Sequence, residues 1–279
     1  MPETIELLVD SMFEDREDDG LLHCSGDILA PMHHLYLNKL GAEKKPNDAA
    51  SKLRMLTGTL WHERFEEVVY ELGGISEIPL AEGLPEGWAG TADALIPSER
   101  RIPEREAPAY RLQDLKTTSV AGLRMNYWIK DTHLWQVSAY YWALDAMGYN
   151  IDPEFDILYV GVSGYRPIPS DSEMAYKTLT SKPLPKDVVW NRLERRMRAL
   201  ENLTELPEQD YEYVWEYGID KKNGLHRVKR THWLTKFCPY DEMACSCNDP
   251  DNIAIEHFDV DDPAEFVYNQ IVEDEYAGY

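Results

Sequence analysis

The residues best suited to chemistry are an acid and an amine two positions apart, Asp114 and Lys116, in the stretch 110–118. Aromatic, β-branched and apolar residues without Gly or Pro predict a β-strand there. Side chains alternate along a strand, so the two would share one face about 7 Å apart. A carboxylate beside an ammonium can hold a divalent cation and stabilise an anionic transition state. An ion pair on an exposed strand is the alternative interpretation.

Asp93 is a second candidate because it interrupts the small and apolar run 89–96. A carboxylate in such a strand needs a partner or a metal ion to offset its desolvation. The alternative is an Asp on an edge strand that faces water.

Three polar residues on predicted helices complete the candidates. His62 lies in the helix predicted for 49–72, one turn after Gly58. Gly in a helix interior costs roughly 1 kcal/mol, which suggests a close approach at that point. Gln136 and Tyr140 lie four residues apart and share a face of the helix predicted for 132–147. A packed or surface histidine and an ordinary amphipathic surface are the alternatives.

The elements that must position these residues follow from periodicity and from Gly and Pro signals. The charged, Pro-rich stretch 97–108 reads as a hairpin connection between two strands. This order of elements predicts an α/β fold with a mixed central sheet flanked by helices. The predicted helices are 28–40, 49–72, 132–147 and 185–203, and the predicted strands are 75–80, 88–96, 110–118 and 155–162.

Composition narrows the class of protein. With 279 residues, 43% of them hydrophobic and eight of them Trp, the chain is expected to form a packed globule. The net charge of −23 works against non-specific adhesion to nucleic acid or anionic membrane. Two basic clusters run against this charge and could contact phosphate or form a solvated surface. They are Arg192, Arg195, Arg196 and Arg198, and then Lys221, Lys222, His226, Arg227, Lys229 and Arg230.

The ends of the chain are acidic. Residues 1–19 lack the basic-then-apolar order of a signal peptide, and no apolar run approaches the roughly 20 residues needed to cross a bilayer. We therefore expect a cytoplasmic protein without a membrane partner. The predicted organisation is an acidic N-terminal segment (1–20), a main domain (21–247) and an acidic C-terminal tail (248–279).

Taken together, the candidates resemble the RecB-like branch of the PD-(D/E)XK nuclease superfamily. They are similar in particular to phage exonucleases and to iron–sulfur nucleases of CRISPR adaptation. In that family a helix supplies a His, one strand an Asp, the next strand an acid-x-Lys, and the following helix a Gln and a Tyr. The matching residues are, in order, His62, Asp93, Asp114, Lys116, Gln136 and Tyr140. Asp114 stands where Glu is common, a replacement that the family pattern allows. The resemblance implies a restriction-endonuclease-like core over about residues 20–247.

The resemblance also implies a site and an activity. Asp93 and Asp114 would chelate Mg²⁺ or Mn²⁺, with His62 and the backbone carbonyl of Leu115 completing the sphere. Lys116 would orient or deprotonate the attacking water, or neutralise charge in the transition state. Gln136 and Tyr140 would hold the DNA strand or brace Lys116. The implied function is a metal-dependent DNA exonuclease acting on single-stranded ends in phage or bacterial recombination, repair or CRISPR adaptation, with a protein of one of those systems as a further partner. A non-catalytic module that binds DNA or a recombinase is the alternative.

Cysteines fit this family less closely. They are Cys24, Cys238, Cys245 and Cys247. In the family, one Cys near the start and three near the end close the domain around a 4Fe–4S cluster. Here Ala30-Pro31 stands at the expected Cys-Pro, and Thr235 stands at a further expected Cys, while Cys24 and Cys247 are extra. Their confinement to two segments favours a relocated 4Fe–4S site; zinc or no metal are the alternatives.

Overall fold

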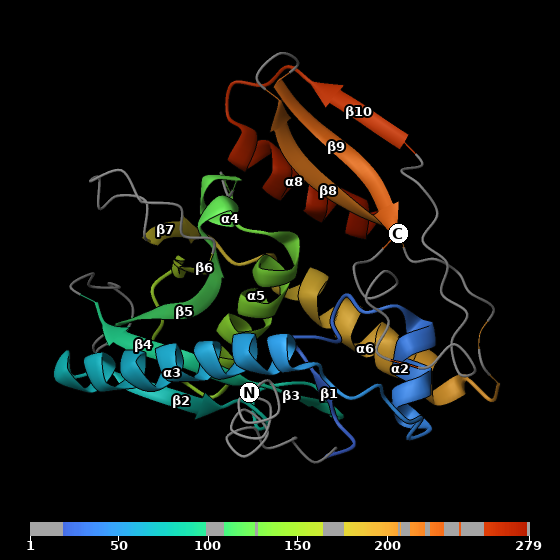
Figure 1. Cartoon of the computed structure of the whole chain (residues 1–279), viewed down its shortest axis with the longest axis horizontal. Helices are drawn as coiled ribbons and strands as arrows, with labels where there is room; N and C mark the ends of the chain where they lie inside the picture. The colour runs from blue at the N-terminus through green and yellow to red at the C-terminus, as the bar shows by residue number, and fades with distance from the viewer. Residues whose placement is uncertain are drawn as a thin grey trace, which may run out of the picture.

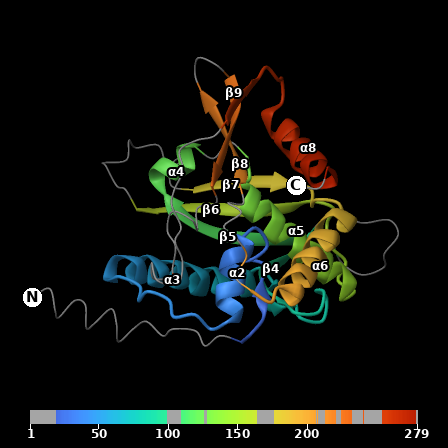
Figure 2. The same ribbon diagram turned by 90° about the vertical axis from the view of Figure 1, so that its right-hand side faces the viewer.

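A computed structural model describes residues 19–98, 109–125, 128–163, 176–205, 207, 213–220, 224–231, 240 and 254–277. A five-stranded sheet lies at the centre of the molecule, and helices pack around it (Figures 1 and 2). The strands are β2 (Ile75–Pro79), β4 (Thr91–Pro97), β5 (Tyr110–Ser119), β6 (Phe155–Ser163) and β7 (Tyr176–Ser181). Their order is β2-β4-β5-β6-β7, with β5 and β6 parallel and the other neighbours antiparallel. The predicted mixed sheet is therefore confirmed.

The long helix α3 (Ala49–Glu71) packs against β2, β4 and β5, as Figure 1 shows. It begins where predicted because the side chain of Asp48 accepts a hydrogen bond from the backbone N–H of Ser51 at 2.6 Å. It ends before Gly73, whose φ of 72° suits a residue without a Cβ.

The connection from β5 to β6 contains α4 (Val120–Met125) and α5 (Asp131–Ala146). Parallel strands need such a crossover. Helix α5 is buried through most of its length, and α6 (Lys186–Asn202) packs on it. The core lies here, with Leu112, Val137, Leu144 and Ile157 all at 0% exposure. Within the described residues, none of the helices combines the length and apolar character that a bilayer crossing requires.

Two predicted elements are shorter than expected. Helix α2 covers Met32–Lys39, because Pro31 forms its N-cap and the preceding residues form turns. The predicted strand 88–96 is divided at Gly90 into β3 (Trp88–Ala89) and β4. Strand β3 leaves the central sheet and pairs in parallel with β1 (Leu22–His23).

The C-terminal quarter forms a separate layer beside the central sheet (Figures 1 and 2). Strands β8 (Tyr213–Asp220), β9 (Gly224–Thr231) and β10 (Ala254–Phe258) form an antiparallel sheet. Helix α8 (Pro263–Tyr276) follows and contacts α6. The described part of the expected acidic tail 248–279 therefore contains a strand and a helix. Its acidic composition concealed the apolar positions Val267 and Ile271, which are buried.

Three of the four arginines of the basic cluster on α6 contact other elements, whereas Arg198 is exposed and pairs with Glu194 of the same helix. The guanidinium of Arg192 lies 2.7 Å from Glu275 of α8, and Arg195 pairs with the same carboxylate. Arg196 is buried and donates to the backbone carbonyl of Ala30. These arginines join the N-terminal turns, α6 and α8. In the second cluster, Arg227 pairs with acids of β10 and α8, while Lys221 and Lys222 lie outside the described residues.

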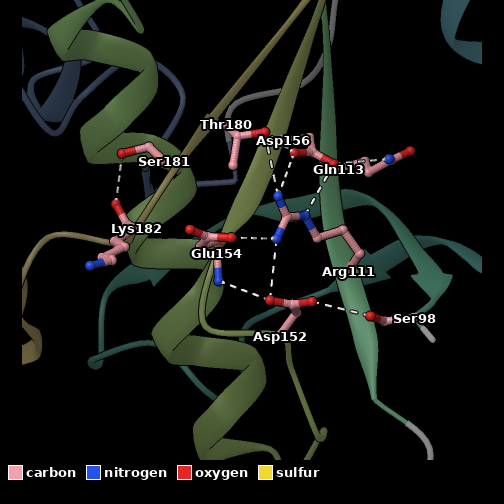
Figure 3. Close-up of polar contacts among 9 residues, drawn as sticks. All are labelled: Ser98, Arg111, Gln113, Asp152, Glu154, Asp156, Thr180, Ser181 and Lys182. Atoms are coloured by element: carbon pink, nitrogen blue, oxygen red, sulfur yellow. Dashed lines mark hydrogen bonds and ion pairs between the residues drawn. The ribbon is translucent and has the colours of Figure 1, made fainter. Parts of the chain in front are cut away.

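A separate set of ion pairs around Arg111, which we call the Arg111 cluster, helps to fix the register of β5 and β6. Arg111 of β5 binds Asp156 of β6 through two nitrogens, at 2.7 and 3.1 Å. The same guanidinium lies 3.2 Å from Asp152 and 3.5 Å from Glu154 (Figure 3). Because β5 also carries Asp114 and Lys116, this cluster helps to hold the candidate residues in place.

Candidate active site

Adjacent strands bring the candidate acids together. The β4–β5 register, extended by one pair, places Asp93 opposite Asp114. The β2–β4 register, read between its flanking pairs, places Glu77 opposite Asp93. Residues opposite each other in an antiparallel pair share a face. Glu77, Asp93 and Asp114 therefore form a row across three strands, which we call the acid row.

Asp93 is the middle member of the acid row and is 9% exposed. Its Oδ2 accepts a hydrogen bond from the backbone N–H of Leu115 at 2.8 Å. The same oxygen lies 3.6 Å from Nδ1 of His62 on α3. Burial raises the pKa of Asp93 to about 6, although Lys116 and the Leu115 N–H act to lower it.

Asp114 is fully buried, and the ammonium of Lys116 lies 2.7 Å from its Oδ2. Burial raises the pKa of Asp114 to about 6, with Lys116 opposing and Asp93 adding to the shift. Among the described residues, Lys116 is the partner of Oδ2, and Oδ1 has no hydrogen-bond donor. Buried oxygens with unused acceptor capacity are what a cation ligand offers.

Lys116 remains charged in this setting. Burial alone would lower its pKa, but Asp114 and Asp93 more than offset this, and the net pKa is raised. A lysine whose pKa is raised stays protonated at neutral pH and is therefore a poor general base. It is well suited to stabilising negative charge.

His62 reaches the acid row from α3 and is half-buried. Burial, followed by the charge of Lys116, lowers its pKa, while Asp114 and Glu66 oppose the shift. Neutral imidazole is the form that binds metal ions. The close approach expected at Gly58 is modest, because an added Cβ would lie 3.7 Å from Thr117 Oγ1, an ordinary contact.

Glu77 was not anticipated from the sequence. It lies in β2 with an exposed side chain and a φ of 49°. One ligand atom each from His62, Glu77 and Asp93 lie within 4.8 Å of one another. In the sequence, Glu77 was recognisable only as a single acid in a predicted apolar strand. The pairing of β2 with β4 is needed to show that it faces Asp93.

Gln136 and Tyr140 lie on the same side of α5, as predicted. Gln136 Nε2 donates to the Tyr140 hydroxyl at 3.1 Å, and both side chains are buried. Burial raises the pKa of Tyr140, and the charges of Asp114 and Asp93 add to the effect. The hydroxyl is therefore within electrostatic range of both acids.

A second polar pair, also missed from the sequence, lies near Lys116. Tyr159 faces Lys116 in the β5–β6 register, and its hydroxyl lies 2.7 Å from His133 Nδ1. Burial and the charge of Lys116 lower the pKa of His133. His133 lies in the first turn of α5, which gave no sequence signal for this contact.

An aromatic groove of about 360 Å³ lies between α3 and strands β5–β7. One of its lining residues, Leu115, lies between Asp114 and Lys116 in β5. Its aromatic and basic lining residues are Trp61, Phe65, Tyr159, Tyr176, Arg64 and Lys177.

The cysteines are tested only in part. Cys24 is a fully buried free thiol, and burial raises its pKa. Cys238, Cys245 and Cys247 lie outside the described residues. Tyr240 lies beside α2, since its hydroxyl donates to the backbone carbonyl of His34 at 3.2 Å. A metal site at the cysteines stays a prediction.

No family model and no curated protein matches the chain. Three solved structures show a distant similarity to the chain. The structure of SSO0001 has a TM-score of 0.42 at 13% identity, over 72% of this chain and 87% of that one. The structure of LHK-Exo in complex with dAMP has a TM-score of 0.41 at 14% identity, over 65% of this chain and 86% of that one. The structure of the alkaline exonuclease LHK-Exo from Laribacter hongkongensis has a TM-score of 0.40 at 12% identity, over 65% of this chain and 88% of that one. TM-scores below 0.5 mark distant likeness, so these structures assign no role to the residues above.

Proposed function

We propose that this protein is a metal-dependent DNA exonuclease that hydrolyses phosphodiester bonds at single-stranded ends, in recombination, repair or CRISPR adaptation. One observation carries the proposal. Asp93 and Asp114 face each other on adjoining strands, the charged Lys116 pairs with Asp114 Oδ2, and the buried Oδ1 of Asp114 has no hydrogen-bond donor among the described residues. Phosphodiester hydrolysis needs an activated water and stabilised anionic charge, which this combination supports.

The side chains fit a hard divalent cation. Asp93 and Asp114 would hold Mg²⁺ or Mn²⁺, with His62 and the carbonyl of Leu115 as further ligands. When bound, such a cation supplies a water of lowered pKa and neutralises charge on the phosphate.

The remaining roles belong to the chain itself. Lys116 would stabilise the negative charge that develops on the phosphate oxygens, because its ammonium stays protonated. Asp93 holds the backbone between Asp114 and Lys116 through its hydrogen bond with Leu115. The buried pair of Gln136 and Tyr140 would brace this arrangement from α5.

The aromatic groove supports the choice of single-stranded DNA. Trp61 and Tyr176 are 42% and 64% exposed, so their rings are accessible to unpaired bases. Stacking of a base on an aromatic side chain contributes about 1–3 kcal/mol and does not depend on base identity. Arg64 and Lys177 in the lining would favour the phosphate backbone locally, which matters for a chain with a net charge of −23.

The test is release of nucleotides from linear single strands labelled at the 5′ or the 3′ end, under anaerobic conditions with Mn²⁺. The parent protein should degrade linear strands and leave circular single strands intact. Asp114→Asn should be inactive and Lys116→Gln should be at least roughly 100-fold slower, whereas Asp261→Asn, an exposed Asp outside the site, should match the parent. Equal activity of Asp114→Asn and the parent would remove the proposal.

A non-catalytic binding module is the second candidate, and the net charge of −23 favours it because it suits docking to a basic partner. It requires tight binding of DNA or of a recombinase without cleavage under any divalent metal. The same assay, run beside a binding measurement, separates the two.

A further inference from the structure

We propose that His133 is a further substrate-binding residue, whose Nε2–H donates a hydrogen bond to a DNA phosphate oxygen beside Lys116, and that Tyr159 positions it. The proposal rests on the proposed function and adds two residues that the motif does not contain. His133 lies in the first turn of α5, and Tyr159 lies in β6.

Tyr159 and His133 both lie near Lys116. In the parallel β5–β6 register Tyr159 is paired with Lys116, so the two side chains lie on the same face of the sheet. Burial lowers the pKa of His133 and the charge of Lys116 adds to the shift, so the imidazole is within electrostatic range of the ammonium. The side chains of Lys116 and His133 are partly exposed, which makes both accessible to a substrate.

His133 belongs to the polar side of α5 that carries the motif. It lies three residues before Gln136 and seven before Tyr140, a spacing that places all three side chains on one side of the helix. Tyr140 is within range of the charge of Asp114, whereas His133 is within range of the charge of Lys116. This side of α5 therefore extends from the acids to the amine, and His133 is its member at the Lys116 end.

Two hydrogen bonds determine which ring nitrogen of His133 carries the proton. The Tyr159 hydroxyl accepts a hydrogen bond from the backbone of Lys130 and lies 2.7 Å from His133 Nδ1. A buried hydroxyl proton needs an acceptor, and Nδ1 is the one that the described residues offer. Tyr159 therefore donates to Nδ1, and the neutral ring carries its proton on Nε2.

The Nε2–H of His133 is a donor that the described residues leave unused, since the hydrogen bond of this ring among them is the one at Nδ1. A donor held in a fixed direction near an ammonium suits a non-bridging phosphate oxygen, which is charged and accepts hydrogen bonds. Because the ring is neutral, it adds this bond without the repulsion that a second cation would meet near Lys116.

The first test is binding of a single-stranded oligonucleotide to the full chain, measured by fluorescence anisotropy with Ca²⁺. The side-chain amide of Gln reaches the place of Nε2 in His, whereas the amide of Asn reaches only the place of Nδ1. His133→Gln should therefore keep most of the affinity. His133→Asn should weaken binding by roughly 10-fold, the loss of one hydrogen bond to a charged group. His257→Asn, at an exposed histidine of β10, is the control and should match the parent.

The two substitutions at His133 also test the simpler role of holding Tyr159. If that were the whole role, His133→Asn would keep the bond to the hydroxyl and bind like the parent, and His133→Gln would be the weaker variant. This reversed order would overturn the proposal.

Replacing one DNA phosphate at a time by a neutral methylphosphonate locates the contact. At the contacted phosphate, the loss caused by His133→Asn should nearly disappear, because both changes remove the same bond. A loss that stays the same at every position would contradict a phosphate contact.

The role of Tyr159 has a readout that does not involve DNA. The ¹⁵N chemical shifts of His133 in the parent chain should report the Nε2–H tautomer, and Tyr159→Phe should give a mixture of the two tautomers. A parent ring that carries its proton on Nδ1 would overturn the proposal even if every variant failed to fold.

These outcomes are distinct from failure of the proposed function. DNA binding that depends on His133, in a protein that cleaves no DNA, would keep the phosphate contact and remove the exonuclease. Cleavage that depends on Asp114, with parental binding in His133→Asn, would do the reverse.

Discussion

The Asp93 carboxylate in β4 accepts a hydrogen bond from the backbone N–H of Leu115 in β5 at 2.8 Å. One acid of the site thereby fixes the backbone that carries the other acid and the amine. The positions of Asp114 and Lys116 relative to Asp93 are therefore set both by this side-chain hydrogen bond and by the backbone pairing of β4 with β5.

The first prediction concerns Asp93 and pH. Its folded-state pKa is raised from 3.8 to about 6, so ionising it destabilises the metal-free fold. The contribution of Asp93 to the free energy of unfolding should therefore fall as pH rises from about 4 to about 6 and then stay level, and Asp114, whose pKa is also raised to about 6, adds to the fall. The effect of Asp93 alone is on the order of 3 kcal/mol.

Asp93→Asn removes this titration and keeps an acceptor for Leu115. It should unfold with nearly the parental free energy at pH 4 and be more stable by on the order of 3 kcal/mol at pH 7. Urea unfolding in EDTA from pH 4 to pH 8 measures the difference. A constant difference across this range would contradict the assigned burial effect.

The second prediction concerns Lys116. Lys116→Gln should lower kcat by at least roughly 100-fold, the effect of losing one group that stabilises transition-state charge. Binding of Mn²⁺ should be as tight as in the parent or tighter, because the variant removes a positive charge beside the acids. Single-turnover kinetics and calorimetry measure the two effects. Weaker metal binding would mean that Lys116 mainly supports the site's structure.

The third prediction concerns Gly90, where β3 ends and β4 begins. A Cβ at this position would lie 2.6 Å from Cε1 of Tyr140. Gly90→Ala should displace the tyrosine ring, lower the free energy of unfolding by roughly 1–3 kcal/mol and reduce cleavage. Gly26→Ala is the control, since an added Cβ there meets no atom within 4 Å. Equal thermal stability of the two variants would refute the contact.

The fourth prediction concerns the Arg111 cluster (Figure 3). Arg111→Met leaves Asp152, Glu154 and Asp156 without this guanidinium and should destabilise the fold by roughly 3 kcal/mol at pH 7. Although burial raises the pKa of Asp156, its hydrogen bonds, led by the one from Arg111, bring the net value below its usual range. Stability from this pair is lost as pH falls, so the effect should shrink below pH 4. Arg111→Lys should recover part of it, because a lysine lacks the two-nitrogen contact.

The fifth prediction concerns the aromatic groove. Trp61→Ala should weaken binding of single-stranded DNA by roughly 10-fold, the loss of one stacked base, and leave duplex binding unchanged. Tyr70→Ala, on the same helix and 64% exposed, is the control because Tyr70 does not line the groove. Fluorescence anisotropy in the presence of Ca²⁺ measures both affinities. Equal weakening by the two variants would show that the groove is not the binding surface.

Local sequence patterns predicted the elements that carry the motif. The stripe over 49–72 and the caps at Asp48 and Gly73 match α3 closely, because helix periodicity and caps are local. The strand 110–118 matches β5 for the same reason. The ends of the helix and the strand that carry the motif were therefore predictable to within a few residues.

The C-terminal layer was not predictable in this way. The place of helix α8 depends on Glu275, which pairs with arginines more than 75 residues earlier in the chain. No local pattern records such a pair. The start of α2 differs for a local reason, because Pro31 is the N-cap and the residues before it, which the sequence pattern assigned to the helix, form turns.

By itself, the sequence determined which residue types could do chemistry and which strands and helices carry them, because propensity and periodicity act over a few residues. Tertiary structure alone decided that Glu77 faces Asp93, that Asp93 accepts a hydrogen bond from Leu115, and that Arg192 and Arg196 of α6 turn inward. These relationships depend on strand order, register and burial, which are set by packing among distant segments.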